Sequence, residues 1–406
     1  MEDLELSGRD SKDSAKNSRL SWLYDYPKIT SLHVENFLSY KSSTLFFDDF
    51  NTLVGPNASG KSNLVEALKI LSEIPGNGIQ SAVARSGGFE LIRHRRTEGK
   101  SGFTKIRLEF EFENCKPSFY EIVLKPVSGK RFGIKSEAAE LNTKLESFWF
   151  KNNGQKLKFV DFMSRANKSK AIEIPDGQSA LGLSGMTGFA VARILSGIHI
   201  IDVNPMQLGE LQDPSISRHL ESDGSNSTSV FENMTESVRT ELIWELSSIL
   251  PEITNIEVLN LANKQTLTFT QGEGKARKKF FASQMSDGTL RAFGILIALR
   301  QGPNSGLIVI EEPERAIHLG ALKSLIEIVR SKSPEIQVLV TTHSADIVNS
   351  TPHKQIRVVW KSDSETSEVS YLAEHTVDLL SKLIMRPGEL LRTYALDPET
   401  KNVSPS

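Results

Sequence analysis

Cysteine is almost absent from this 406-residue sequence, which contains Cys115 and no other. A single cysteine excludes an intramolecular disulfide, so we expect a reducing, cytoplasmic compartment. Long hydrophobic runs are also missing, because stretches such as FGILIAL at 293–299 are far shorter than the roughly 20 residues that span a bilayer. We therefore expect a protein without a membrane-spanning segment.

Neither sign of charge is in large excess. The formal net charge is −2, so no global basic field points to nucleic acid or to a membrane surface. Hydrophobic residues make up 38% of the chain, which is the ordinary composition of a globular protein with a core. The N-terminal segment is polar and lacks the apolar stretch of a signal peptide, so we predict a disordered tail over 1–26 and a flexible C-terminus over 396–406.

A glycine-rich loop, GPNASGKS at 55–62, follows the strand-like FNTLV and precedes the helical NLVEALKILSEI. This order of strand, loop and helix is that of a P-loop, whose backbone N–H groups face phosphate oxygens. Lys61 can reach the terminal phosphates, and the Ser62 hydroxyl can bind Mg²⁺. The residues predicted to contact ATP are Gly55, Pro56, Asn57, Ala58, Ser59, Gly60, Lys61, Ser62 and Asn63.

Two carboxylates stand at the end of an apolar stretch in LIVIEEPE at 307–314. The apolar residues predict a strand buried on both faces, and ligands of open α/β sheets bind at the carboxyl ends of such strands. Glu311 can complete the shell of a Mg²⁺ ion, and Glu312 can orient and deprotonate an attacking water. A second apolar strand, in VLVTTHS at 338–344, ends near His343, which can sense a γ-phosphate.

The stretch SDGTLR at 286–291 places small polar residues at the start of a long apolar helix. One interpretation is that Ser286 caps the helix, because the first N–H groups of a helix need acceptors. The other is that these N–H groups bind an anion. The stretch alone leaves both open.

The four segments occur in the order GPNASGKS, SDGTLR, LIVIEEPE and TTHS. This order resembles the ABC-type ATPases, in particular the branch of SMC, RecF and overcoming-lysogenisation-defect proteins. The resemblance implies an α/β P-loop NTPase fold, ATP and Mg²⁺ as cofactors, and hydrolysis of ATP. It implies that Lys61 and Ser62 are the Walker A residues, Glu311 the metal-binding acid, Glu312 the catalytic base and His343 the switch histidine.

The resemblance also assigns a role to the start of the apolar helix. Ser286, Asp287 and Gly288 match the signature motif, which in this class caps the γ-phosphate held by a second subunit. It therefore implies a homodimer or a higher oligomer that forms through ATP sandwiched between heads. His318 matches a histidine of the branch's EEPExxxH pattern, whereas the following Leu319–Gly320 lacks the usual proline.

The content of the segment between Lys61 and Glu311 helps to distinguish the related branches of this ATPase class. It contains no sustained heptads, so we expect no coiled-coil arm. Segments such as IRLEFEF and FWFKNNGQKLKF alternate apolar and polar residues like antiparallel strands. The predicted architecture is an ABC-type head with an antiparallel β lobe and a mixed α+β insertion. The predicted single domain covers 27–395, with its core in 28–75 and 285–395 and the inserted lobe in 76–284.

Two basic clusters remain, one at 93–100 and one at 275–279. Sequence-independent contact with nucleic-acid phosphates is one interpretation, for which the candidates are Arg95, Arg96, Lys278 and Lys279. Solvated loops are the alternative. Only a short stretch follows His343, and no metal-ligand spacing of a nuclease is recognisable. We therefore expect an ATPase that regulates a separately encoded effector, a nuclease or toxin in anti-phage defence, with a RecF-like DNA-repair ATPase and a non-catalytic ATP-dependent scaffold as alternatives.

Overall fold

The computed structural model divides into two compact units, one formed by 1–46 and 66–198 and the other by 47–65 and 199–406. The structure describes residues 26–94, 102–128, 131–144, 146–160, 169–175, 177–272, 274–300, 306–382, 385–393 and 396–399. The predicted N-terminal tail, Arg95, Arg96, Lys100 and residues 400–406 lie outside the described residues, apart from Tyr26 at the end of the tail.

The first unit is built on an eight-stranded sheet in the order β2-β1-β4-β5-β6-β7-β8-β9, in which every neighbouring pair is antiparallel. Its strands are β1 (Lys28–Phe37), β2 (Tyr40–Phe46), β4 (Thr104–Glu111), β5 (Ser118–Val127), β6 (Arg131–Asn142), β7 (Ser147–Asn152), β8 (Lys156–Val160) and β9 (Ser169–Glu173). Along β4 buried residues alternate with half-buried ones, as the apolar–polar alternation of the sequence predicts. The antiparallel sheet is therefore confirmed.

In the described part of this unit, the sheet is accompanied by most of α2 (Lys61–Arg85), by α3 (Phe89–Ile92) and by α4 (Gly185–Ser196). Helix α2 is interrupted at Gly78, whose φ of 75° departs from helical geometry, three residues after Pro75. The turn between β7 and β8 needs Gly154, because its φ is 91° and an added Cβ would lie 2.6 Å from the Ile134 carbonyl oxygen.

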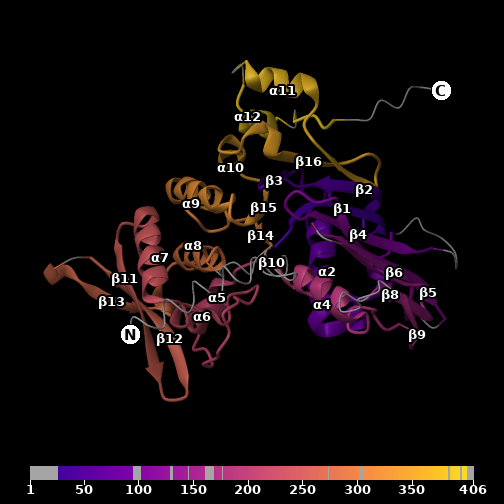
Figure 1. Ribbon diagram of the computed structural model, residues 1–406. Helices are drawn as coiled ribbons and strands as arrows, with labels where there is room; N and C mark the ends of the chain where they lie inside the picture. The colour runs from indigo at the N-terminus through magenta and orange to yellow at the C-terminus, as the bar shows by residue number, and fades with distance from the viewer. Residues whose placement is uncertain are drawn as a thin grey trace. The chain divides into compact units, whose positions relative to one another are not determined.

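The second unit contains a six-stranded sheet in the order β10-β14-β15-β3-β16-β17. Figure 1 labels β10, β14, β15, β3 and β16 of this sheet. Its strands are β10 (Ile198–Ile201), β14 (Leu307–Glu311), β15 (Gln337–Thr342), β3 (Phe50–Val54), β16 (Ile356–Lys361) and β17 (Ser367–Ser370). Strands β14, β15, β3 and β16 run parallel. Glu311 lies opposite Thr341, and Thr342 lies opposite Val54, so the carboxyl ends of the three central strands meet at one edge.

The core of the second unit joins this sheet to helices α8 (Asp287–Ala298) and α9 (Leu319–Lys332). The same core includes residues of α6 (Ser227–Glu232) and α7 (Glu236–Ile249). It also includes residues of a three-stranded sheet, which consists of β11 (Ile253–Leu261), β12 (Lys264–Gln271) and β13 (Lys278–Phe281). Helix α7 buries Leu242, Leu246 and Ile249 along one face, whereas Val238 is half-buried. The remaining helices of the described second unit are α5 (Pro205–Gly209), α10 (Ala345–Asn349), α11 (Glu374–Ser381) and α12 (Pro387–Arg392).

The two units differ from the predicted division into core and lobe. The prediction assigns β1 and β2 to the core, but β1 pairs with β4 in the antiparallel sheet. It assigns residues 199–284 to the lobe, but they pack on α8 in the second unit because their apolar side chains share its core. At the C-terminus, Asp397 accepts a hydrogen bond from the Ala373 N–H (2.9 Å) through its backbone carbonyl. The domain boundaries themselves stay a prediction.

No helix in the described part of the chain is long and apolar enough to span a bilayer.

Candidate functional site

The glycine-rich loop joins β3 to α2 and is shaped by two glycines. Gly55 is buried, and an added Cβ would lie 2.1 Å from the Val359 carbonyl oxygen, so a larger residue has no room there. Gly60 has a φ of 117°, in the region that favours glycine. Because Lys61 is the first residue of α2, the loop ends at a helix N-terminus, where free N–H groups favour an anion.

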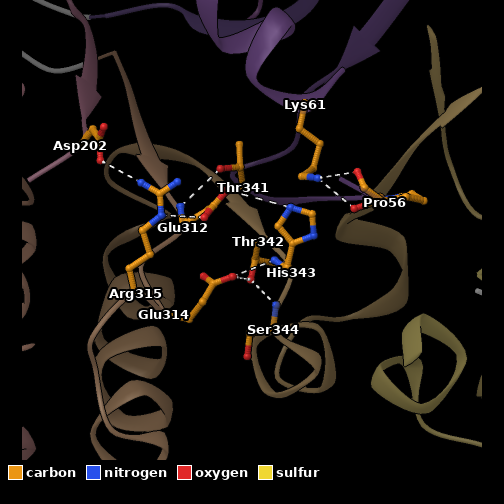
Figure 2. Close-up of polar contacts among 11 residues, drawn as sticks. Pro56, Lys61, Asp202, Glu312, Glu314, Arg315, Thr341, Thr342, His343 and Ser344 are labelled. Atoms are coloured by element: carbon orange, nitrogen blue, oxygen red, sulfur yellow. Dashed lines mark hydrogen bonds and ion pairs between the residues drawn. The ribbon is translucent and has the colours of Figure 1, made fainter. Parts of the chain in front are cut away.

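Lys61 folds back onto the loop. Its Nζ donates to the carbonyl oxygens of Gly55 at 2.8 Å and Pro56 at 3.1 Å (Figure 2). The side chain is buried, and this burial lowers the pKa of Lys61 to about 8, against the opposing effect of the Glu312 and Glu314 carboxylates. An ammonium held by two neutral carbonyls can exchange them for phosphate oxygens, which offer full negative charge.

The acid pair ends strand β14. Glu311 is the last residue of the strand, and Glu312 follows with a φ of 43°, an uncommon backbone conformation for a glutamate. The Glu312 N–H donates to the Thr341 carbonyl oxygen at 2.9 Å. Its carboxylate accepts a hydrogen bond from Arg315 Nε at 2.7 Å, and its other oxygen lies 4.0 Å from His343 Nε2.

His343 is held in place by Glu314. One carboxylate oxygen of Glu314 accepts from the His343 N–H at 2.7 Å and from the Thr342 hydroxyl at 2.8 Å. Burial, and next the charge of Lys61, lower the pKa of His343 below its ordinary value, while Glu312 and Glu314 oppose them. The imidazole is therefore neutral at pH 7 and can accept as well as donate a hydrogen bond.

A cavity of about 610 Å³ lies beside the loop. Gly55, Pro56 and Asn57 line one part of it, and His343 and β16 line others. Lys61, Glu312 and His343 thus meet at the carboxyl edge of the parallel strands, where the sequence places a nucleotide.

The start of α8 shows that Ser286 caps the helix. Its hydroxyl oxygen accepts from the Thr289 N–H at 3.2 Å, which is the first of the two interpretations left open by the sequence. Gly288 is needed inside the subunit, because an added Cβ would lie 2.3 Å from the Ala316 carbonyl oxygen. Ser286 and Asp287 are exposed, so the end of the helix remains accessible to a ligand, and the second interpretation stays a prediction.

The second basic cluster surrounds the turn between β12 and β13. Lys275, Arg277, Lys278 and Lys279 are all exposed, and Lys279 forms an ion pair with Glu257. A neighbouring carboxylate weakens the field of this cluster, and nucleic-acid contact stays a prediction.

Three further charged residues of the site were not predicted from the sequence: Asp202, Glu314 and Arg315. Arg315 Nη1 lies 3.8 Å from Asp202 Oδ1. The hydrogen bond that Arg315 donates to Glu312 raises the pKa of Arg315. Glu314 is the last glutamate of the EEPE stretch, and the only signal for Arg315 was its position directly after that stretch. Asp202 follows β10, far away in the sequence, and nothing in its local pattern indicates the contact.

The residues at the loop fit a nucleotide with Mg²⁺. The buried Ser59 hydroxyl inside the loop has no hydrogen-bond partner in the described structure, and the Ser62 hydroxyl is exposed at the start of α2. Among the described residues no group of three or more His, Cys, Asp or Glu is arranged to hold a metal ion. A metal at this loop therefore needs phosphate oxygens or waters beside Ser62 and Glu311, as Mg²⁺ in P-loop sites takes them.

Two family models match the chain in succession. Residues 28–178 match a family described as "AAA ATPase domain". Residues 190–349 match a family described as "AAA domain, putative AbiEii toxin, Type IV TA system". The two matches contain the glycine-rich loop and the acid pair, respectively.

Curated relatives are structural maintenance of chromosomes proteins. Protein 1 of Schizosaccharomyces pombe is 25% identical over 118 residues, which cover 27% of this chain and 10% of that protein. Protein 2 of Saccharomyces cerevisiae is 33% identical over 94 residues, covering 22% of this chain and 8% of that protein. The chain thus matches about a tenth of the length of these relatives.

Solved structures agree in fold. One is an SMC head bound to the C-winged helix domain of ScpA, with a TM-score of 0.55 and 15% identity over 87% of this chain and 99% of that chain. Another is an SMC head derived from Pyrococcus furiosus, with an extended coiled coil and bound to the C-terminal domain of ScpA. It has a TM-score of 0.55 and 13% identity over 88% of this chain and 100% of that chain. With the order of the four motifs, the two family matches and the SMC relatives support an SMC/RecF-like ATPase of the ABC type, and the solved structures show that the chain has the fold of an SMC head.

Proposed function

We propose that this chain binds ATP with Mg²⁺ at residues 55–63 and hydrolyses the ATP with Glu312 as general base. The observation that carries the proposal is the meeting of Lys61, Glu312 and His343 at the carboxyl ends of β3, β14 and β15. A phosphate-binding cation, a carboxylate that can take a proton and an imidazole that can orient a water are groups suited to phosphoryl transfer to water.

Each residue has a separate task in this scheme. Lys61 exchanges the Gly55 and Pro56 carbonyl oxygens for phosphate oxygens. Ser62 and Glu311 hold Mg²⁺, which neutralises the charge on the phosphates. Glu312 accepts a proton from the attacking water, and His343 orients that water by a hydrogen bond.

The proposed active form is a dimer or a higher oligomer formed through ATP. The exposed Ser286 and Asp287, with the N-terminus of α8 behind them, face the ATP held by a partner subunit. The dipole of α8 favours the negative charge of a γ-phosphate at this end.

The proposed biological role is control of a separately encoded effector, a nuclease or toxin that acts in anti-phage defence. The description of the family matched by residues 190–349, which names a toxin of a toxin–antitoxin system, supports this role. A RecF-like role in DNA repair is the alternative, and the similarity to SMC proteins is compatible with it. An inactive scaffold is disfavoured, because Glu312 is present beside Lys61 and His343.

The test compares Glu312→Gln with Lys61→Ala. Glu312→Gln should slow hydrolysis about 100-fold or more while leaving ATP bound, because a general base typically contributes that much and the phosphate loop is untouched. Lys61→Ala should instead weaken ATP binding. The matched control is Glu335→Gln, at an exposed glutamate of the same unit, which should leave turnover unchanged. Wild-type turnover in Glu312→Gln would contradict the assignment of the base.

A further inference from the structure

Among the described residues, Glu312 accepts a side-chain hydrogen bond through one carboxylate oxygen and not through the other. Oε2 accepts the hydrogen bond from Arg315 Nε at 2.7 Å, whereas Oε1 faces His343 Nε2 at 4.0 Å (Figure 2). Charge-assisted hydrogen bonds of this length are among the stronger polar contacts in proteins. Arg315 therefore fixes one oxygen and leaves the other directed toward the histidine.

Arg315 is itself oriented by Asp202. Arg315 Nη1 lies 3.8 Å from Asp202 Oδ1, and Arg291 Nη1 lies 3.9 Å from the same oxygen. These distances are those of ion pairs rather than of direct hydrogen bonds. The Arg315 guanidinium therefore interacts with two carboxylates, those of Asp202 and Glu312.

Arg291 brings helix α8 into this network. It is the arginine of SDGTLR, its side chain is buried, and its Nε has no hydrogen-bond partner in the described structure. The same helix also touches the segment that follows Glu312, because the Gly288 backbone packs on the Ala316 carbonyl oxygen. The start of α8 and the segment carrying Glu312 and Arg315 are therefore joined by a backbone contact and by a chain of charges.

We propose that Arg315 is a positioning residue for hydrolysis, which holds Glu312 so that Oε1 receives the proton of the attacking water, with Asp202 holding Arg315 in that orientation. The proposal rests on the proposed function, since it assumes that Glu312 is the base. Arg315 acts through Glu312 and its effect is on geometry. Its loss should therefore lower kcat and leave ATP binding intact.

The first test is the steady-state kinetics of Arg315→Ala. The kcat should fall about 10- to 100-fold, the range expected when a reacting group is misplaced by about 1 Å, while the KM for ATP changes less than about twofold. Guanidinium ion added to the assay should restore part of the kcat, because Arg315 is half exposed and the space it leaves is open to solvent. The control is Arg218→Ala, at an exposed arginine in the same unit, which should match the wild type with or without guanidinium.

The second test asks whether Asp202 acts through Arg315. Asp202→Asn should lower kcat less than Arg315→Ala does, and the double variant should be no slower than Arg315→Ala alone. Additive losses would refute the role of Asp202. A wild-type kcat in Arg315→Ala, or a loss that guanidinium does not restore, would overturn the proposal for Arg315. If Glu312→Gln is slow in the same assay, the proposed function survives that failure; if Glu312→Gln turns over like the wild type, both fail.

Discussion

The strongest prediction concerns Ser286, because its two proposed tasks can be separated. The structure shows the hydroxyl as the cap of α8, accepting from the Thr289 N–H at 3.2 Å and sharing a hydrogen bond with the Thr289 hydroxyl at 2.8 Å. Ser286→Ala removes the cap and adds no bulk, and should cost about 1 kcal/mol of stability. Ser286→Arg removes the same cap and adds a long cation at the exposed end of the helix.

If Ser286 faces the ATP of a partner subunit, Ser286→Arg should abolish hydrolysis while its own loop still binds ATP. Mixing it with Lys61→Ala protein sharpens the test. In a mixed dimer of two subunits related head to head, one composite site carries both changes and the other carries neither. Random assortment makes half of the dimers mixed, so about one quarter of the wild-type rate should return if the two sites act independently.

The assay is the release of phosphate by equimolar mixtures, together with thermal unfolding of each variant. Ser286→Ala is the control, because it should melt as low as Ser286→Arg and yet keep most of its activity. A cap without any role toward a partner lowers the melting temperature in the same way but gives normal activity per folded molecule in both variants and no gain on mixing. That pattern would refute the dimeric site.

Two remaining predictions use charge. Because burial lowers the pKa of Lys61 to about 8, the side chain loses its proton as the pH rises through that value. The affinity for ATP should therefore be constant below this pKa and should approach a tenfold loss for each pH unit above it. Titration calorimetry with a non-hydrolysable ATP analogue should show this loss in the wild type and a flatter profile in Lys61→Arg, whose charge persists. If the basic turn contacts DNA or RNA, the slope of log affinity against log salt should decrease by about one in Lys278→Ala and by less in Lys279→Ala, since Lys279 is paired with Glu257. A wild type that shows no binding at low salt would assign the cluster to a solvated loop.

The sequence by itself determined the local parts of this protein. The turn GPNASGKS between a strand and a helix, the acids at the end of LIVI and the alternating strands of the first unit all follow from neighbouring residues. These signals act over a few neighbouring positions: backbone propensity, glycine at a crowded turn and the period of apolar residues. They can therefore be recognised from the sequence without the tertiary structure. The cap formed by Ser286 is equally local, since donor and acceptor are three residues apart.

Only the tertiary structure decided what surrounds Glu312. Its Arg315 partner is local, but Asp202 reaches Arg315 from β10, and Arg291 reaches Asp202 from α8. The need for glycine at 288 likewise comes from the Ala316 carbonyl oxygen and from no property of SDGTLR. Such contacts join residues that are distant along the chain, and they depend on how helices and strands pack in three dimensions, which no local pattern specifies.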